Sequence, residues 1–380
     1  MTFTIVILIS VLSVACYFGL IFFFTCGWFS LKTTDYNPHA FRTTVSIIIP
    51  FRNEEENIEP LLKSLSGQQY PKELFEIILV DDHSTDHSYD IVAQFIKINF
   101  SATIKLFALD KSDGFSKKAA LKKGVENSRG KLVVTTDADC IFDNNYLSCL
   151  VSFYEQNNCR LISGPVVFKD SKGLFTNLAS LEFLSLIASG AGAISLNKPF
   201  LANGANFCFE HSLFEELNGY TSHDSYASGD DVFFLLQAKK HIKNKNKICF
   251  IKNRESIVTT QGPANLKEFI QQRVRWASKS PAYEDFFAKF TAGSVFFFNL
   301  ALVLLLICGF IDFRFAIIAA IMFAGKLAVD LPLMFAAASF VKKKRLMWFY
   351  LPLQLIYPLY VVFIAISSLF VKVEWKGRKI

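Results

Sequence analysis

The stretch Lys131-Leu-Val-Val-Thr-Thr-Asp137-Ala-Asp139 places an apolar, β-branched run directly before two carboxylates. Such a run is typical of a buried strand. Because residues i and i+2 of an extended chain point the same way, we expect Asp137 and Asp139 to face one ligand together. Paired carboxylates suit Mg²⁺ or Mn²⁺, and these cations in turn bind phosphates. The alternative interpretation is a polar turn after a strand, where Asp is common.

The sequence on both sides of this stretch alternates between strand-like and helix-like patterns. We predict strands over residues 45–50, 76–82, 104–109, 132–136 and 161–168. We predict helices that start within residues 51–57 and at Ser84, and further helices over residues 119–126 and 145–156. This alternation predicts an α/β fold with a largely parallel, helix-covered sheet.

Polar residues follow three of the predicted strands, at the edge where such sheets bind ligands. They are the segment from Pro50 to Glu54, the pair Asp81 and Asp82, and the pair Asp137 and Asp139. A divalent ion on the last pair would neutralise charge on a diphosphate. Asp81 or Asp82 can accept a hydrogen bond from a base or ribose. These residues together predict a site for a nucleotide diphosphate.

Further chemistry is expected downstream. Asp231 is placed to act as a general base on an acceptor hydroxyl, although paired acids at a helix start also serve as caps. Lys117 and Arg275 are candidates to hold the diphosphate. Residues 265–276 form an amphipathic pattern that ends in Gln272-Arg-Val-Arg-Trp276. It predicts a helix against the sheet or in the membrane interface, or else a surface helix with a solvated basic face.

The composition indicates a membrane protein. Hydrophobic residues make up 52% of the 380 residues, 41 of them Phe, and they gather toward the two ends. The net charge of +7 is too diffuse to argue for nucleic acid as a partner. The eight Cys show no C-x-x-C pair, so we expect reduced thiols, no zinc site and a cytoplasmic catalytic domain.

Residues 4–29 are long and apolar enough to span a bilayer, and the absence of preceding basic residues argues against a signal peptide. Later spans are predicted at 295–311, 315–340 and 347–370, with Lys326 and Asp330 spaced to pair inside the bundle. The basic run 342–345 is expected in the cytoplasm. Three C-terminal spans would put the basic tail outside, so a re-entrant segment or a miscounted helix is implied. Residues 174–196 predict either a covered core helix or a membrane-surface, acceptor-facing helix.

From these patterns we divide the chain into a transmembrane anchor (1–31), a catalytic domain that ends in an interfacial helix (40–290), C-terminal transmembrane helices (291–371) and a basic tail (372–380). We expect an integral protein of the bacterial inner membrane, with the catalytic domain in the cytoplasm.

Several segments, in this order, resemble the motifs of membrane-bound family 2 glycosyltransferases of the cellulose synthase and hyaluronan synthase-like superfamily. They are Ile47-Ile-Ile-Pro50-Phe-Arg52-Asn53-Glu54, Leu79-Val-Asp81-Asp82-His-Ser-Thr-Asp86, Thr136-Asp-Ala-Asp139, Asp230-Asp231 and Gln272-x-x-Arg275-Trp276. Ser116-Lys117-Lys-Ala-Ala-Leu is similar to the family's Gly-Lys-x-x-Ala-Leu segment, and Ala202-Asn203-Gly204-Ala-Asn206 to its acceptor-side turn. The similarity spans residues 45–276.

The resemblance implies the A-type, Rossmann-like glycosyltransferase fold and inversion at the anomeric carbon. It implies that Pro50, Arg52, Asn53, Glu54, Asp81, Asp82, Lys117, Asp137, Gln272, Arg275 and Trp276 bind the nucleotide sugar. It also implies that Asp137 and Asp139 hold Mg²⁺ or Mn²⁺, that Asp231 is the catalytic base, and that Asn203, Gly204 and Asp230 face the acceptor. The usual Glu-Asp pair is Asp230-Asp231 in this chain.

The sequence thus predicts an inverting, metal-dependent transfer from a nucleotide-diphosphate sugar, UDP-linked, to a membrane lipid or lipid-linked acceptor. Four spans offer little material for a polymer channel, so a processive polysaccharide synthase is the alternative within this class. A catalytically silent membrane scaffold and a transporter are alternatives from other classes. The intact set of acids argues against the scaffold, because buried acids cost stability unless they have a role.

Overall fold

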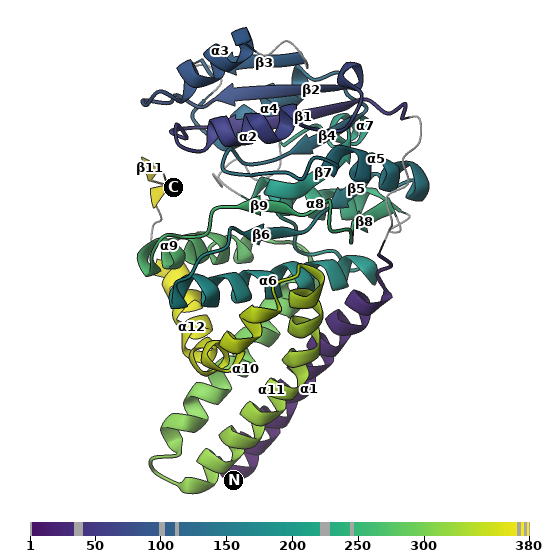
Figure 1. Cartoon of the computed structure of the whole chain (residues 1–380). Helices are drawn as coiled ribbons and strands as arrows, with labels where there is room; N and C mark the ends of the chain where they lie inside the picture. The colour runs from purple at the N-terminus through teal and green to yellow at the C-terminus, as the bar shows by residue number, and fades with distance from the viewer. Residues whose placement is uncertain are drawn as a thin grey trace.

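The computed structural model describes residues 2–33, 41–98, 103–110, 114–220, 229–243, 247–370, 374–375 and 378–379. A seven-stranded sheet, in the order β3-β2-β1-β4-β7-β5-β8, forms the globular domain (Figure 1). Its strands are β1 (Val45–Phe51), β2 (Phe75–Asp81), β3 (Thr103–Ala108), β4 (Leu132–Thr135), β5 (Leu161–Ser163), β7 (Phe207–Glu210) and β8 (Ile248–Phe250). Only β7 runs antiparallel to its neighbours in this sheet. The predicted mostly parallel α/β fold is confirmed.

Helices flank this sheet because each has apolar residues to bury. They are α2 (Ile58–Ser66), α3 (Ser88–Ile98), α4 (Lys117–Glu126), α5 (Tyr146–Asn157), α7 (His211–Glu216) and α8 (Asp230–His241), with the short 3₁₀ turns η1 (Lys72–Leu74) and η2 (Gly204–Asn206). In α2, for example, Ile58, Leu61, Leu62 and Leu65 recur at helical spacing and all four are buried. Strands β1, β2 and β4 are buried along their whole length, as parallel strands covered on both faces must be.

Three predicted element boundaries are wrong. The helix predicted to start at Ser84 begins at Ser88. The strand over residues 161–168 is two strands, because β5 ends before Gly164-Pro165 and β6 (Val166–Phe168) pairs instead with β9 (Val258–Thr260) in a second sheet. Pro165 has no N–H for a central ladder, which favours this break. The helix expected to start within residues 51–57 begins only at Ile58. Asn53 has a φ of 51° and turns the chain toward the next strand end instead.

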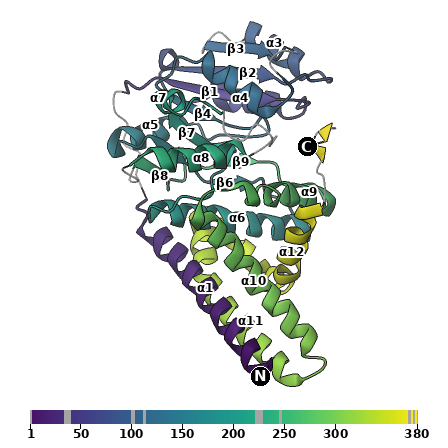
Figure 2. The same cartoon turned by 180° about the vertical axis from the view of Figure 1, so that it is seen from behind.

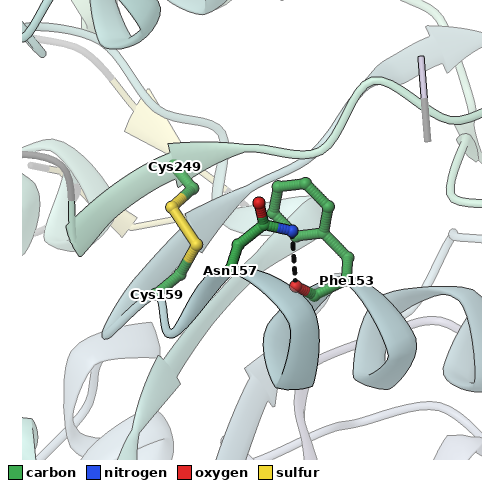
Figure 3. The surroundings of a disulfide bond; sticks show 4 residues. All are labelled: Phe153, Asn157, Cys159 and Cys249. Carbon is green, nitrogen blue, oxygen red and sulfur yellow. Dashed lines mark hydrogen bonds between the residues drawn. A yellow bond between two sulfur atoms is a disulfide. The ribbon is translucent and has the colours of Figure 1, made fainter. Parts of the chain in front are cut away.

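A disulfide joins Cys159 to Cys249, beside the end of α5, where the Asn157 side chain donates to the Phe153 carbonyl (Figure 3). The prediction of reduced thiols is therefore wrong for this pair. The two cysteines are 90 residues apart in sequence, so spacing carries no signal. They meet because β5 and β8 are neighbouring strands, held at this end by the bond from Arg160 N to Lys247 O at 2.7 Å.

Helices α1 (Thr2–Ser30), α10 (Phe286–Cys308), α11 (Phe313–Phe340) and α12 (Tyr350–Phe370, preceded by η5, Lys344–Phe349) form a bundle below the domain. Figures 1 and 2 show α6 (Leu174–Ser195) and α9 (Leu266–Ala277) lying crosswise between the bundle and the sheets. Five helical segments of the described chain, α6 among them, are apolar and long enough to cross a membrane. The apolar window of α6 is 67% buried, against 33% or less for the others. The protein is thus membrane-associated, and α6 forms a covered layer.

Helix α12 contains Pro358 and bends, so that both of its ends lie toward the globular domain, whereas the turn between α10 and α11 lies at the far end of the bundle (Figure 1). The missing N–H and the ring of a proline inside a helix account for a bend of this kind. The basic run 342–345 and the last described strands, β10 (Glu374–Trp375) and β11 (Arg378–Lys379), therefore lie on the domain side. Because this final helix re-enters instead of crossing, the basic tail need not lie on the opposite side of the membrane from the basic run 342–345.

The first helix is built into the domain rather than tethered to it. The Lys252 ammonium, on the loop after β8, donates to the carbonyls of Trp28 (2.8 Å) and Leu31 (3.2 Å) and lies over the Trp28 ring. A cation at these last carbonyls complements the helix dipole. Along the helix, a Cβ on Gly27 would lie 2.0 Å from the carbonyl oxygen of Gly192 in α6. The backbones of α1 and α6 are therefore in direct contact.

A buried polar cluster holds the bundle together. Lys326 and Asp330 form the pair predicted from their spacing, at 2.6 Å. Tyr17 of α1 donates to Asp330 at 2.9 Å, and Gln354 of α12 bonds to both members of the pair. Because each charged group is paired, this cluster links three helices and needs no ligand to explain it.

We expect Gly27→Ala to destabilise the protein by about 1–3 kcal/mol, because overpacking must push α1 away from α6. The matched control is Gly19→Ala in the same helix, where an added Cβ meets nothing within 4 Å. Thermal melts in detergent measure both variants. Equal melting temperatures for the two would contradict the close helix contact.

Thiol titration tests the disulfide. Denatured but unreduced protein is expected to show six reactive thiols, and reduced protein eight. The variant with Ser at positions 159 and 249 should show six under both conditions. Eight thiols before reduction of the natural chain would show that the two cysteines are not bonded.

Candidate active site

Hydrogen bonds connect the loops that follow β1 and β2, so that the two loops form one continuous surface. The Arg52 guanidinium donates to the carbonyls of Asp82 (2.8 Å) and His83 (2.9 Å). The Asn53 side-chain oxygen accepts from the Thr85 N–H at 2.8 Å, and the Asp81 carboxylate accepts from the Ser84 N–H. The structure thus brings together the predicted donor-side residues from Pro50 to Glu54 with Asp81 and Asp82.

The two carboxylates that follow β4 have different partners. Asp137 forms an ion pair with Lys117 at the start of α4. Burial opposes the charge of that lysine, but Asp137 outweighs it and raises the pKa of Lys117 to about 12. Asp139 accepts from the Thr260 hydroxyl of β9 at 2.8 Å. Burial, then the negative charges of Asp137 and Glu54, raise the pKa of Asp139 to about 6.

These two carboxylates fit a divalent cation whose remaining ligands come from the phosphates of a bound substrate. Acidic neighbours oppose the ionisation of Asp139, and a bound cation would favour it by neutralising the nearby negative charge. Among the described residues, no three His, Cys, Asp or Glu side chains cluster as a preformed cage. Mg²⁺ is commonly held by one or two carboxylates together with phosphate oxygens, which matches Asp137 and Asp139.

The paired acids of α8 lie beside the turn at Asn203 and Gly204, which was predicted to face the acceptor. Gly229, with a φ of 93°, precedes the helix, and its conformation suits glycine. The Asp231 carboxylate accepts from the Gly204 N–H at 2.7 Å, whereas Asp230 is buried, which raises its pKa. The predicted group of Asn203, Gly204, Asp230 and Asp231 therefore lies together in space.

Helix α9 carries a buried ion pair and, on the cavity side, a cation with no side-chain partner among the described residues. Arg273 donates to the Glu182 carboxylate of α6 at 3.1 Å, and the Tyr360 hydroxyl of α12 donates to the same carboxylate at 3.0 Å. These contacts fix α9 between α6 and α12. The Arg275 guanidinium makes no hydrogen bond to any residue that the structure describes, and burial lowers its pKa.

One cavity of about 490 Å³ connects these groups. Its polar part is lined by Lys117, Asp137, Asn203, Gly204, Asp230, Asp231, Gln272, Arg275, Trp276 and Lys279. Its apolar part is lined by α6, α10 and α12, through residues such as Ile187, Val295, Phe296, Val361 and Ile364. Pro50, Arg52, Asn53, Glu54, Asp81, Asp82 and Asp139 lie outside this lining, at or behind the strand ends beside it. The predicted site is thus a surface of strand ends that adjoins an amphiphilic cavity.

Several residues of this site were not predicted from the sequence: Glu182, Thr260, Lys279 and Tyr283. Two of them carried a usable signal. Glu182 is a single acid within the apolar stretch 174–196, and Lys279 lies four residues after Arg275, on the same side of a continuing helix. Nothing local marks Thr260 or Tyr283.

The chain matches the sequence model of Glycosyl transferase family group 2 over residues 132–369 and that of Glycosyl transferase family 2 over residues 46–217. It therefore belongs to the family 2 glycosyltransferases and is a transferase. It is 29% identical to Glycosyltransferase AglE of Haloferax volcanii, over 51% of this chain and 60% of that protein. It is 30% identical to a dodecaprenyl-phosphate galacturonate synthase of Rhizobium johnstonii, over 32% of this chain and 35% of that protein.

Among solved structures, the fold is similar to that of mannosyltransferase PcManGT from Pyrobaculum calidifontis, determined with GDP-Man and Mn²⁺. The TM-score is 0.62 at 20% identity, over 96% of this chain and 99% of that one. This likeness confirms the A-type glycosyltransferase fold that the sequence predicted.

We expect Arg273→Met to cost about 3–5 kcal/mol, because it leaves Glu182 charged and unpaired in an apolar layer. Adding Glu182→Met should recover much of that loss, since an apolar pair can replace a buried ion pair. The control is Lys240→Gln, which removes an exposed pair with Glu284 and should cost less than about 1 kcal/mol. Melting temperatures in detergent measure these effects, and equal losses for Arg273→Met and the control would contradict the role of the buried pair.

Proposed function

We propose that the protein transfers a sugar, with inversion, from a nucleotide-diphosphate sugar, UDP-linked, to a membrane lipid or lipid-linked acceptor. The observation that carries the proposal is the single cavity that runs from Asp137 and Asp231 to the apolar faces of α6, α10 and α12. Such a cavity suits an acceptor with a polar reacting end and a hydrocarbon tail. The name of the Rhizobium relative, a dodecaprenyl-phosphate galacturonate synthase, agrees with an acceptor of this kind.

The roles follow the motif positions of cellulose-synthase-like glycosyltransferases. Asp82, with Asp81, would accept from the base, and Lys117 and Arg275 would hold the diphosphate. Asp137 and Asp139 would hold Mg²⁺ or Mn²⁺, which would neutralise charge on the departing diphosphate.

Asp231 would act as general base. Its Oδ2 already accepts the Gly204 N–H and its Oδ1 accepts the Val232 N–H at 2.8 Å, so the carboxylate is held in place with a lone pair left on each oxygen. An acceptor hydroxyl would lose its proton to this carboxylate as its oxygen attacks the anomeric carbon. Asn203, Gly204 and Asp230 would line the acceptor side, and Gln272 and Trp276 the boundary between the two substrates.

The membrane side of the reaction follows from charge. The basic run 342–345 lies at the domain end of the bundle, which by the positive-inside rule supports a cytoplasmic domain, on the side where nucleotide sugars are made. We propose the bacterial inner membrane as its location.

Release of nucleoside diphosphate from a panel of UDP-, GDP- and dTDP-sugars tests the proposal. Asp139→Asn should lower kcat/KM by about 100-fold or more, because a cation ligand is lost, and a chelator should abolish turnover. Asp90→Asn on the exposed face of α3 is the matched control and should have no effect. Unchanged turnover in Asp139→Asn would refute the metal assignment.

Mass spectrometry of the product separates the two modes of transfer. A single added sugar supports transfer to a lipid acceptor. A ladder of increasing length would instead show a processive polysaccharide synthase.

A further inference from the structure

We propose that Lys279, together with Arg275, forms a subsite for the phosphate of a lipid phosphate monoester, and that this monoester is the acceptor. The inference deepens the proposed function, on which it rests, because it names the acceptor's chemical class. It assigns a binding role to a lysine outside the Gln272-x-x-Arg275-Trp276 motif.

The first support is a cation without a partner. Lys279 is only 6% exposed, and its ammonium forms no hydrogen bond or ion pair with any residue in the described part of the chain. Arg275, one helical turn earlier, also has no such partner. The two other bases that line the cavity are paired, Lys117 with Asp137 and Arg273 with Glu182. Burial of an unpaired charge is costly, so two such side chains in one cavity point to an anionic ligand.

The position of Lys279 assigns it to the acceptor side of the cavity rather than to the donor side. Its stem packs on Gly229 at the start of α8, where an added Cβ would lie 2.7 Å from its Cδ and 3.0 Å from its Nζ. Its ammonium thus lies near Asp230 and Asp231, the acceptor-side acids. Arg275 is also close enough to Asp137 to be influenced by it, so it bridges the donor and acceptor sides.

The cavity continues from Lys279 toward hydrocarbon. Beyond Ser280 and Tyr283, the lining passes to α10, where Ala288, Thr291 and Val295 share one face. The Thr291 hydroxyl is buried and has no hydrogen-bond partner among the described residues, so it offers one more donor on this route. Facing α10 are Val361, Ile364 and Ala365 of α12. A phosphate at Lys279 would therefore place its alkyl chain between these helices.

The charge of the subsite favours phosphate over a neutral head group. Burial, then the neighbouring Arg275, lower the pKa of Lys279 to about 8. A phosphate dianion would offset both effects and satisfy both cations through charge-assisted hydrogen bonds. An alcohol, such as a polyprenol or a diacylglycerol, would leave the Lys279 ammonium without an anionic ligand, whereas Arg275 could still contact the donor diphosphate.

The reaction then follows directly. A phosphate oxygen attacks the anomeric carbon, the bond from that carbon to the nucleoside diphosphate breaks, and the bonding electron pair leaves with the diphosphate. The dianion needs to lose no proton, whereas the proton of a monoanion passes to Asp231. The products are a lipid-linked sugar phosphodiester and a nucleoside diphosphate.

Binding to the full-length protein in detergent tests the inference, with dodecyl phosphate as the probe and dodecanol as its neutral match. We expect dodecyl phosphate to bind at least tenfold tighter than dodecanol. Lys279→Gln should weaken the binding of dodecyl phosphate by about 10- to 100-fold, which is the effect of losing a charged hydrogen bond. It should leave the affinity for UDP within twofold of that of the natural chain. Lys289→Gln, an exposed lysine on α10, should change neither.

Equal binding of the two probes by the natural chain would overturn the inference. So would a Lys279→Gln variant that weakens UDP instead, because Lys279 would then serve the donor diphosphate. If Lys279→Gln does not fold, the test is whether the natural chain and Lys279→Arg both bind dodecyl phosphate more tightly than dodecanol. Equal binding of the two probes would overturn the inference. Turnover assays separate the two proposals: no release of nucleoside diphosphate from any donor defeats the proposed function, whereas turnover with dodecanol or lipid-linked glycans but not with lipid phosphates defeats only this inference.

Discussion

The balance of buried charge is the constraint on which the rest of this structure depends. Within the described lining of the cavity, the acids Asp137, Glu182, Asp230 and Asp231 face the bases Lys117, Arg273, Arg275 and Lys279. They come from five elements or their ends, α4, β4, α6, α8 and α9, between residues 117 and 279 of the sequence. The set therefore exists only when the sheet, α8 and the α6–α9 layer are assembled together. Unpaired charges in an apolar environment are costly, so each of these groups must find either a protein partner or a ligand.

This constraint makes the domain and the membrane helices one unit. The Glu182–Arg273 pair and Tyr360 fix α9 against the bundle, and Lys252 ties the end of α1 to the loop after β8. The polar end of the cavity is therefore held at a fixed place relative to the apolar helices. The proposed transfer from a water-soluble sugar donor to a hydrocarbon-bearing acceptor needs such a fixed junction, because the two substrates would approach from different solvents.

The sequence predicted the parallel sheet, the strand ends and the motif acids, because strand periodicity and paired carboxylates are local signals. It did not predict the disulfide between Cys159 and Cys249 or the division of β5 from β6, since both depend on which strands become neighbours. The bend in α12 was only implied, through the conflict over the basic tail. Lys279 was missed because a single lysine after a helix looks like a solvated residue until its burial is known.

Photo-crosslinking tests the central claim, that one cavity joins the acids to the acceptor's hydrocarbon chain, most directly. An alkyl phosphate with a diazirine at the end of its chain would be irradiated with the protein, and its adducts mapped by mass spectrometry. We expect adducts on Val295 or Phe296 of α10 and on Val361 or Ile364 of α12, which line the cavity. Adducts confined to outward-facing residues such as Phe297 and Leu304, which are 62% and 50% exposed, would contradict it.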